Sequence, residues 1–128
     1  MPLSIDDRLA IMELAARYNQ AIDSGDIDGW LATWTADGVF ERPDALCEGW
    51  EAMRRFVTEF VEKWKPARHW SANFLIRGEG TAATMSSYFN FFGVRGKAKL
   101  ITTGRYDDVL VKVDGAWKFK HRKVSFDG

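Results

Sequence analysis

The residues best suited to chemistry in this sequence are a histidine and an aspartate far apart in the chain, His69 and Asp23. His69 opens the stretch RHWSANFLI. Alternation along a strand would place His69, Ser71 and Asn73 on one face, with apolar residues such as Phe74 on the other. Histidine is the side chain best suited to move protons near neutral pH. A polar row led by an imidazole, on an otherwise apolar strand, predicts a cavity lined by a proton-transfer group.

Asp23 falls in the last turn of a predicted helix. A carboxylate there faces the negative end of the helix dipole, at a cost of about 0.3–1 kcal/mol. A nearby cation would offset that cost, and an imidazolium is one candidate. A carboxylate that bonds one ring nitrogen fixes the tautomer and leaves the other nitrogen free to take a proton from a substrate. The alternative is that Asp23 belongs to a turn with Ser24 and Asp26, where it caps backbone amides.

Three further polar residues are candidates to bind or polarise a substrate. Tyr18 lies five residues before Asp23, about 140° round the helix at ~100° per residue, so the two would flank a cavity rather than share a stripe. The alternative for Tyr18 is a place in the core. Asn73 either orients a substrate carbonyl or satisfies a backbone bulge. Arg122 either binds a carboxylate or enolate, or lies with its lysine neighbours on a solvated strand face.

Aromatic residues make up 14% of the chain, including six tryptophans and nine phenylalanines. Most of them are expected in the core, but Trp34, Phe56, Phe60 and Tyr88 are candidates to line a pocket for a flat, mostly apolar ligand. The sequence contains no residue set with metal-ligand spacing, no phosphate-binding glycine loop and no dinucleotide fingerprint. A mechanism without cofactor or metal is therefore the default expectation.

Composition limits the class of protein further. The chain has 128 residues, the size of one domain, and is 46% hydrophobic. Its 18 basic and 18 acidic residues create no overall field that would favour nucleic acid or an anionic membrane. Cys47 is the only cysteine and is interpreted as a packing residue. No signal peptide or membrane span is evident, so a cytoplasmic protein is expected.

The first half of the chain predicts three helices. Ser4 with Asp7 is typical of a helix start, an apolar stripe follows, and Gly25 ends the helix. Asp26 is positioned to cap a short second helix that carries Trp30 and Trp34. The pair at 37–38 indicates a turn, residues 39–41 a short strand, and the segment that follows, up to residue 49, a polar loop. A third stripe runs over 53–64 and ends at Pro66.

The second half predicts antiparallel strands over 69–77, 82–92, 98–112 and 117–126. Helices first and strands last favour an α+β single domain, with helices packed on a strongly curved sheet. In the last strand, Trp117 and Phe119 have the opposite parity to Arg122 and Val124. If both pairs face inward, a bulge must absorb one residue near position 120 or 121.

These segments together resemble the SnoaL-like branch of the nuclear-transport-factor-2-like superfamily. The resemblance rests on ELAARYNQAIDSGDIDGWLATWTADGVFE, the helix at 50–64, RHWSANFLI and GRYDDVLVKVDGAWKFKHR. It implies a cone of three helices on a mostly antiparallel sheet that encloses a pocket. In the dehydratase and dehydrochlorinase members, a helix-1 aspartate pairs with a histidine at a strand start; Asp23 and His69 match those positions. Tyr18 matches the dehydratase tyrosine, and Arg122 an arginine used on the last strand in some members.

The resulting hypothesis is a cofactor-independent lyase, dehydratase or cyclase acting on a small hydrophobic, oxygenated molecule. His69 would be the base, Asp23 would orient it, and Tyr18, Asn73 or Arg122 would polarise the substrate. Two alternatives stay open, because the fold alone does not determine chemistry. One is a non-catalytic module that binds a small molecule or a protein, and the other is an accessory subunit of a ring-hydroxylating dioxygenase. The resemblance also implies a homodimer formed through the outer face of the sheet. The alternative is that the apolar residues of the strands pack only beneath the helices.

Overall fold

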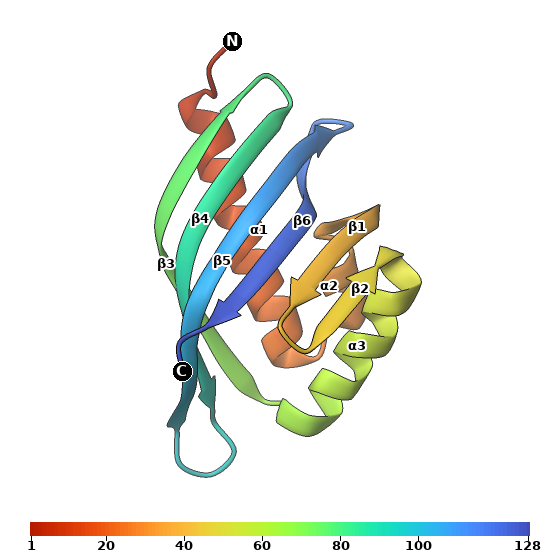
Figure 1. Cartoon of the computed structure of the whole chain (residues 1–128), viewed down its shortest axis with the longest axis vertical. Coiled ribbons are helices and arrows are strands. Elements are labelled where there is room, and N and C mark those ends of the chain that lie inside the picture. The colour runs from red at the N-terminus through yellow and green to blue at the C-terminus, as the bar shows by residue number, and fades with distance from the viewer.

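A six-stranded mixed sheet with three helices against it forms the whole chain (Figure 1). The computed structural model describes all 128 residues. The helices are α1 (Ile5–Ser24), α2 (Ile27–Leu31) and α3 (Gly49–Trp64). The strands are β1 (Trp34–Arg42), β2 (Ala45–Glu48), β3 (Ala67–Glu79), β4 (Ala82–Gly93), β5 (Lys99–Val113) and β6 (Ala116–Phe126). The expected α+β architecture is therefore confirmed.

The strands follow the order β2-β1-β6-β5-β4-β3, and every neighbouring pair is antiparallel except β1 with β6. The sheet does not close, because β2 and β3 form its two edges. Helix α1 crosses behind the long strands, and α3 lies beside the short β1–β2 hairpin (Figure 1). No helix combines the length and apolar character that a membrane crossing requires.

Helix α1 begins and ends where the sequence indicates. Ser4 and Asp7 form a reciprocal capping box, and Gly25 ends the helix in the left-handed conformation, with φ at 81°. Glycine adopts that conformation without the steric cost that a side chain brings. The second carboxylate oxygen of Asp7 accepts hydrogen bonds from Lys112 and Trp117, each at 3.0 Å. The start of α1 is thereby attached to the far end of the sheet.

Two bulges decide which side chains face the helices. In β6 the register shifts after Leu110↔Phe119 to Val109↔His121, so the predicted bulge at residue 120 or 121 is confirmed. In β3 the register shifts between Ala72 and Leu75, where Asn73 has a φ of 62°. The alternation predicted for β3 fails at this second bulge. As a result Phe74 packs against the core, on the side to which His69 points, and not on the opposite face.

The region between α2 and α3 differs most from the prediction. Trp34 opens β1 and does not belong to the second helix, and the expected turn at 37–38 lies inside that strand. The expected polar loop contains strand β2, Ala45–Glu48, paired antiparallel with β1. The register of β1 against β6 shifts between Trp34 and Val39, which accommodates the turn-forming residues. Residues 35–38 have no partner in β6, so the local turn signal appears as an irregularity within the strand.

Candidate functional site

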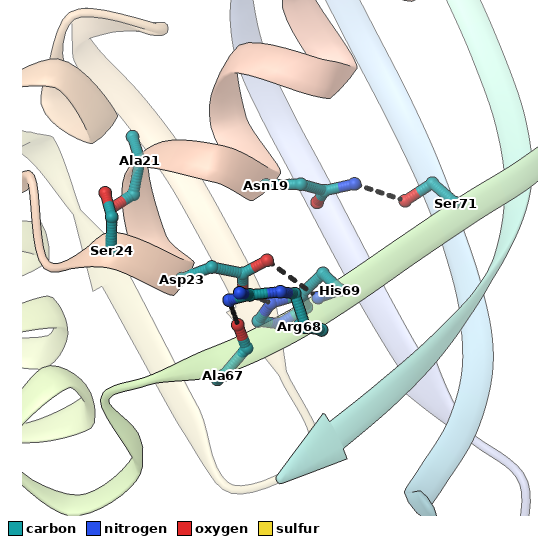
Figure 2. Close-up of polar contacts among 8 residues, drawn as sticks. All are labelled: Asn19, Ala21, Asp23, Ser24, Ala67, Arg68, His69 and Ser71. Carbon is teal, nitrogen blue, oxygen red and sulfur yellow. Dashed lines mark hydrogen bonds and ion pairs between the residues drawn. The ribbon is translucent and has the colours of Figure 1, made fainter. Parts of the chain in front are cut away.

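Asp23 and His69 meet between the last turn of α1 and the start of β3 (Figure 2). The Asp23 Oδ1 atom lies 2.6 Å from His69 Nδ1, and Oδ2 accepts the backbone N–H of His69 at 2.9 Å. Both side chains are 8% exposed. One carboxylate therefore holds both the backbone and the ring of the histidine. The alternative, in which Asp23 caps backbone amides of its own turn, does not occur.

A second contact one helical turn earlier supports this arrangement. Asn19 Nδ2 donates to Ser71 Oγ at 3.0 Å, and Figure 2 shows it beside the Asp23–His69 contact. Four residues of helix rise about 6 Å, and two residues of strand about 6.6 Å. Because these rises are similar and α1 and β3 run in opposite directions, Asn19 lies opposite Ser71 and Asp23 lies opposite His69. This double contact fixes the position of the imidazole.

The His69 ring lines a cavity of about 310 Å³ between the sheet and the helices. Its walls are mainly apolar, with Ile22, Phe56, Phe60, Trp64, Phe89 and Phe91 among them. The ring lies between Phe60 and Phe91, at centroid distances of 5.9 and 4.6 Å. His69 Nε2 makes no hydrogen bond within the protein. With Nδ1 held by Asp23, Nε2 is the ring nitrogen left for a ligand.

Two tyrosines, Tyr18 and Tyr106, add polar groups to the same cavity. Burial raises the pKa of the Tyr18 hydroxyl above its ordinary value, and the Arg122 guanidinium opposes that rise. Burial likewise raises the pKa of Tyr106. Both hydroxyls are therefore protonated at neutral pH and are suited to donate hydrogen bonds to a substrate oxygen.

Arg122 is buried behind these tyrosines and does not line the cavity. It donates to Asp108 through Nε at 2.7 Å and Nη2 at 3.0 Å. Its guanidinium carbon lies 3.6 Å from the Tyr106 ring centroid and 4.5 Å from that of Tyr18. Burial raises the pKa of the Asp108 carboxyl, and Arg122 opposes that rise. Arg122 therefore reaches a ligand only through the tyrosines, and it is not on a solvated strand face.

The structure does not bring three other predicted residues to the cavity. Asn73 is exposed at the bulge of β3, so of the two roles open to it from the sequence it has the one at the backbone bulge. Tyr88 is 55% exposed, because the inward positions of β4 are those of Ser87 and Phe89. Trp34 is a core residue, 1% exposed, whose ring packs against that of Tyr18. Of the predicted aromatic residues, Phe56 and Phe60 do line the cavity.

Sequence reasoning missed four polar residues of this region: Asn19, Arg42, Thr102 and Tyr106. Asn19 precedes Asp23 by one helical turn, a spacing that could have identified it. Tyr106 lies in a predicted strand, two residues before Asp108, but nothing local indicates which face it takes. Arg42 lines the cavity from the end of β1, a strand that the sequence signals as only three residues long. No group of three or more histidine, cysteine, aspartate or glutamate side chains is arranged to hold a metal ion.

Comparison with known proteins identifies the family of this chain. Residues 3–123 match the family described as the SnoaL-like domain. A Nostoc punctiforme protein of unknown function with a cystatin-like fold is 30% identical, with a TM-score of 0.93 over 99% of this chain and 96% of that one. A candidate aromatic ring hydroxylase from Novosphingobium aromaticivorans is also 30% identical, with a TM-score of 0.86 over 97% and 91%.

A candidate scytalone dehydratase from Novosphingobium aromaticivorans is 22% identical, with a TM-score of 0.87 over 97% of this chain and 86% of that one. At that identity the likeness is one of fold alone. No curated protein sequence matches this chain.

Proposed function

This chain belongs to the SnoaL-like domain family, and we propose that it is a cofactor-independent lyase that eliminates water from a small, ring-containing hydroxy ketone. The observation that carries the proposal is the buried Asp23–His69 contact at the wall of an apolar cavity. The fold fits a family of polyketide cyclases and dehydratases. Ring closure also begins with removal of a proton next to a carbonyl, so the same base serves either reaction.

In the proposed reaction, His69 Nε2 takes a proton from the carbon next to the substrate carbonyl. Asp23 holds the proton on Nδ1 and stabilises the imidazolium that forms. The electron pair of the broken C–H bond moves to the carbonyl oxygen, which becomes an enolate. Tyr18 and Tyr106 supply hydroxyl donors to that oxygen. When the enolate collapses, the C–O bond to the hydroxyl group breaks, and the imidazolium returns its proton to the departing oxygen as water.

A direct test uses 3-hydroxy-1-tetralone, whose loss of water gives 1-naphthol after tautomerisation. The expected result is formation of 1-naphthol, followed by absorbance or fluorescence. His69→Ala and Asp23→Asn are each expected to lower the rate by about 100- to 10,000-fold, the usual worth of a general base. His121→Ala is the matched control, because His121 is the other histidine, is 40% exposed and bonds Glu41 away from the cavity.

The result that would contradict the proposal is turnover retained in both variants, with circular dichroism spectra like that of the wild type. Deuterium exchange next to the carbonyl of 1-tetralone in D₂O tests proton removal separately from loss of water. A wild-type protein that catalyses neither exchange nor elimination would favour the alternative of a binding module. In that case a ligand would raise the melting temperature without being changed.

The likeness to a candidate aromatic ring hydroxylase favours a second candidate, an accessory subunit of such an enzyme. An accessory subunit has no need of a buried carboxylate–imidazole pair facing a cavity. The two candidates differ in one measurable respect. A lyase converts its substrate as an isolated chain, whereas an accessory subunit has activity only with a catalytic partner.

A further inference from the structure

Arg42 contributes the only formally charged side chain to the cavity wall, apart from His69 when protonated. The other lining side chains are apolar or are neutral hydroxyls such as those of Tyr18 and Thr102. No acidic side chain lines the cavity. A mostly apolar site with one fixed positive charge discriminates in favour of an anionic group on its ligand.

The Arg42 guanidinium is held in place but is only partly paired. Its Nε donates to Asp44 Oδ1 at 3.0 Å, and neither terminal nitrogen makes a hydrogen bond. Its side chain is 18% exposed, whereas that of Asp44 is 69% exposed. The hydrogen bond from Arg42 lowers the pKa of Asp44, so this partner is ionised at neutral pH. The terminal nitrogens of a guanidinium can bind a carboxylate in a fixed geometry.

Aromatic rings surround this cation. The guanidinium carbon lies 5.0 Å from the Phe56 ring centroid, 5.1 Å from that of Phe126 and 5.9 Å from that of Phe40. Such contacts orient the guanidinium but leave its N–H groups without acceptors. If Arg42 served only as an exposed partner of Asp44, neither the surrounding rings nor the position at the cavity wall would be needed.

Helix α3 connects Arg42 to His69 through two stacked rings. Phe56 and Phe60 are one turn apart, with ring centroids 6.1 Å from each other. Phe56 is next to Arg42, and Phe60 is next to His69. A flat ligand packed along these two rings would have one end at the cation and the other at the imidazole. The cavity of about 310 Å³ is at the small end of ligand sites, which limits the ligand to a few fused rings.

We propose that Arg42 anchors a carboxylate, and that the site takes small fused-ring carboxylic acids. The carboxylate lies at Arg42, the ring system along Phe56 and Phe60, and the reacting carbon at His69. The statement about the reacting carbon rests on the proposed lyase function. The carboxylate anchor does not, because it concerns binding alone.

The test compares 2-naphthoate with its neutral analogue 2-naphthamide by calorimetric titration. The wild type is expected to bind the acid at least about tenfold more tightly than the amide, equivalent to about 1.4 kcal/mol. Arg42→Gln is expected to remove this preference while leaving the affinity for the amide unchanged. Arg42→Lys keeps the charge without the guanidinium geometry and should retain part of the preference. Arg55→Gln is the control, since it removes the same charge from an exposed site on α3.

The anchor is overturned if the wild type shows no preference for the acid, or if Arg42→Gln keeps it. If Arg42→Gln does not fold, Arg42→Lys tests the anchor in its place. A lysine variant that keeps the full wild-type preference for the acid would contradict recognition of the carboxylate by the guanidinium geometry. His69→Ala is expected to keep the preference for the acid. A wild type that prefers the acid but does not turn over the tetralone would refute the lyase while supporting the anchor, so the two failures are distinguishable.

Discussion

Replacement of Arg122 by methionine tests how the buried ion pair behind the cavity contributes to stability. Arg122 is 1% exposed and Asp108 is 4% exposed, and two hydrogen bonds of 2.7 and 3.0 Å join them. Arg122→Met leaves the Asp108 carboxylate buried without its partner, a change that costs about 3–5 kcal/mol. A chain of 128 residues has a total stability of roughly 6–19 kcal/mol, so the variant is expected to remain folded.

The double variant Asp108→Leu/Arg122→Met separates charge from packing. It removes both charges and leaves apolar side chains, so we expect it to lie within about 2 kcal/mol of the wild type. Urea denaturation followed by tryptophan fluorescence measures the free energy of unfolding of each variant. The single variant should also melt about 10–20 °C below the wild type. A double variant as unstable as the single one would refute the reasoning, because the loss would then come from packing.

The single variant also has a predicted pH dependence. Burial raises the pKa of Asp108, and without Arg122 nothing comparable opposes that rise. A folded-state pKa above the unfolded value of 3.8 means that the folded protein binds the extra proton. The free energy of unfolding of Arg122→Met should therefore fall as the pH rises above about 4. The double variant, which lacks the carboxyl group, should not show this additional fall.

Three further predictions concern residues that stabilise the fold outside the cavity. Hydrogen bonds from Trp117 and Lys112 lower the pKa of Asp7 from 3.8 to about 2. The stability that this carboxylate supplies is present above about pH 4 and is lost as the pH falls toward 2. The free energy of unfolding of Asp7→Asn, measured by urea denaturation, should therefore fall less steeply than that of the wild type across this range. Asn73→Gly should preserve stability and turnover while Asn73→Ala loses about 1 kcal/mol of unfolding free energy, because the φ of 62° is a left-handed conformation that glycine and asparagine adopt at lower cost than alanine. A loss of turnover in Asn73→Gly would instead restore Asn73 as a substrate ligand. A Cβ at Gly104 would meet the backbone carbonyl oxygen of Ser125 and, at 2.6 Å, the Phe89 ring, so Gly104→Ala should cost about 1–3 kcal/mol in thermal or urea unfolding; an unchanged stability would contradict close packing at this position.

Sequence reasoning succeeded where the determining contacts are local. The capping box at Ser4, the glycine after α1 and the bulge in β6 each follow from a few adjacent residues. The proximity of Asp23 to His69 came from the family resemblance, since nothing in a separation of 46 positions indicates contact. The homodimer, the small hydrophobic ligand and the cytoplasmic location remain predictions.

The errors arose where long-range pairing decides which way a side chain points. Tyr88 was expected in the pocket because β4 has aromatic residues at both parities, and only its pairing with β5 fixes which set is buried. Asn73 shares the parity of His69 in sequence, but the bulge removes it from that face. Arg42 was missed because it extends β1 by pairing with Ala45 of β2, a strand that lies where the sequence indicates a polar loop.

The tautomer of His69 tests the central claim most directly and requires no substrate. Long-range ¹⁵N–¹H NMR correlation distinguishes the two ring nitrogens, and a His121→Asn variant assigns the signals. Because Asp23 Oδ1 lies 2.6 Å from Nδ1, we expect the neutral ring to carry its proton on Nδ1, with a lone pair on Nε2. Asp23→Asn should lose this single tautomer. A neutral ring with its proton on Nε2 in the wild type would contradict the assignment of His69 as the base.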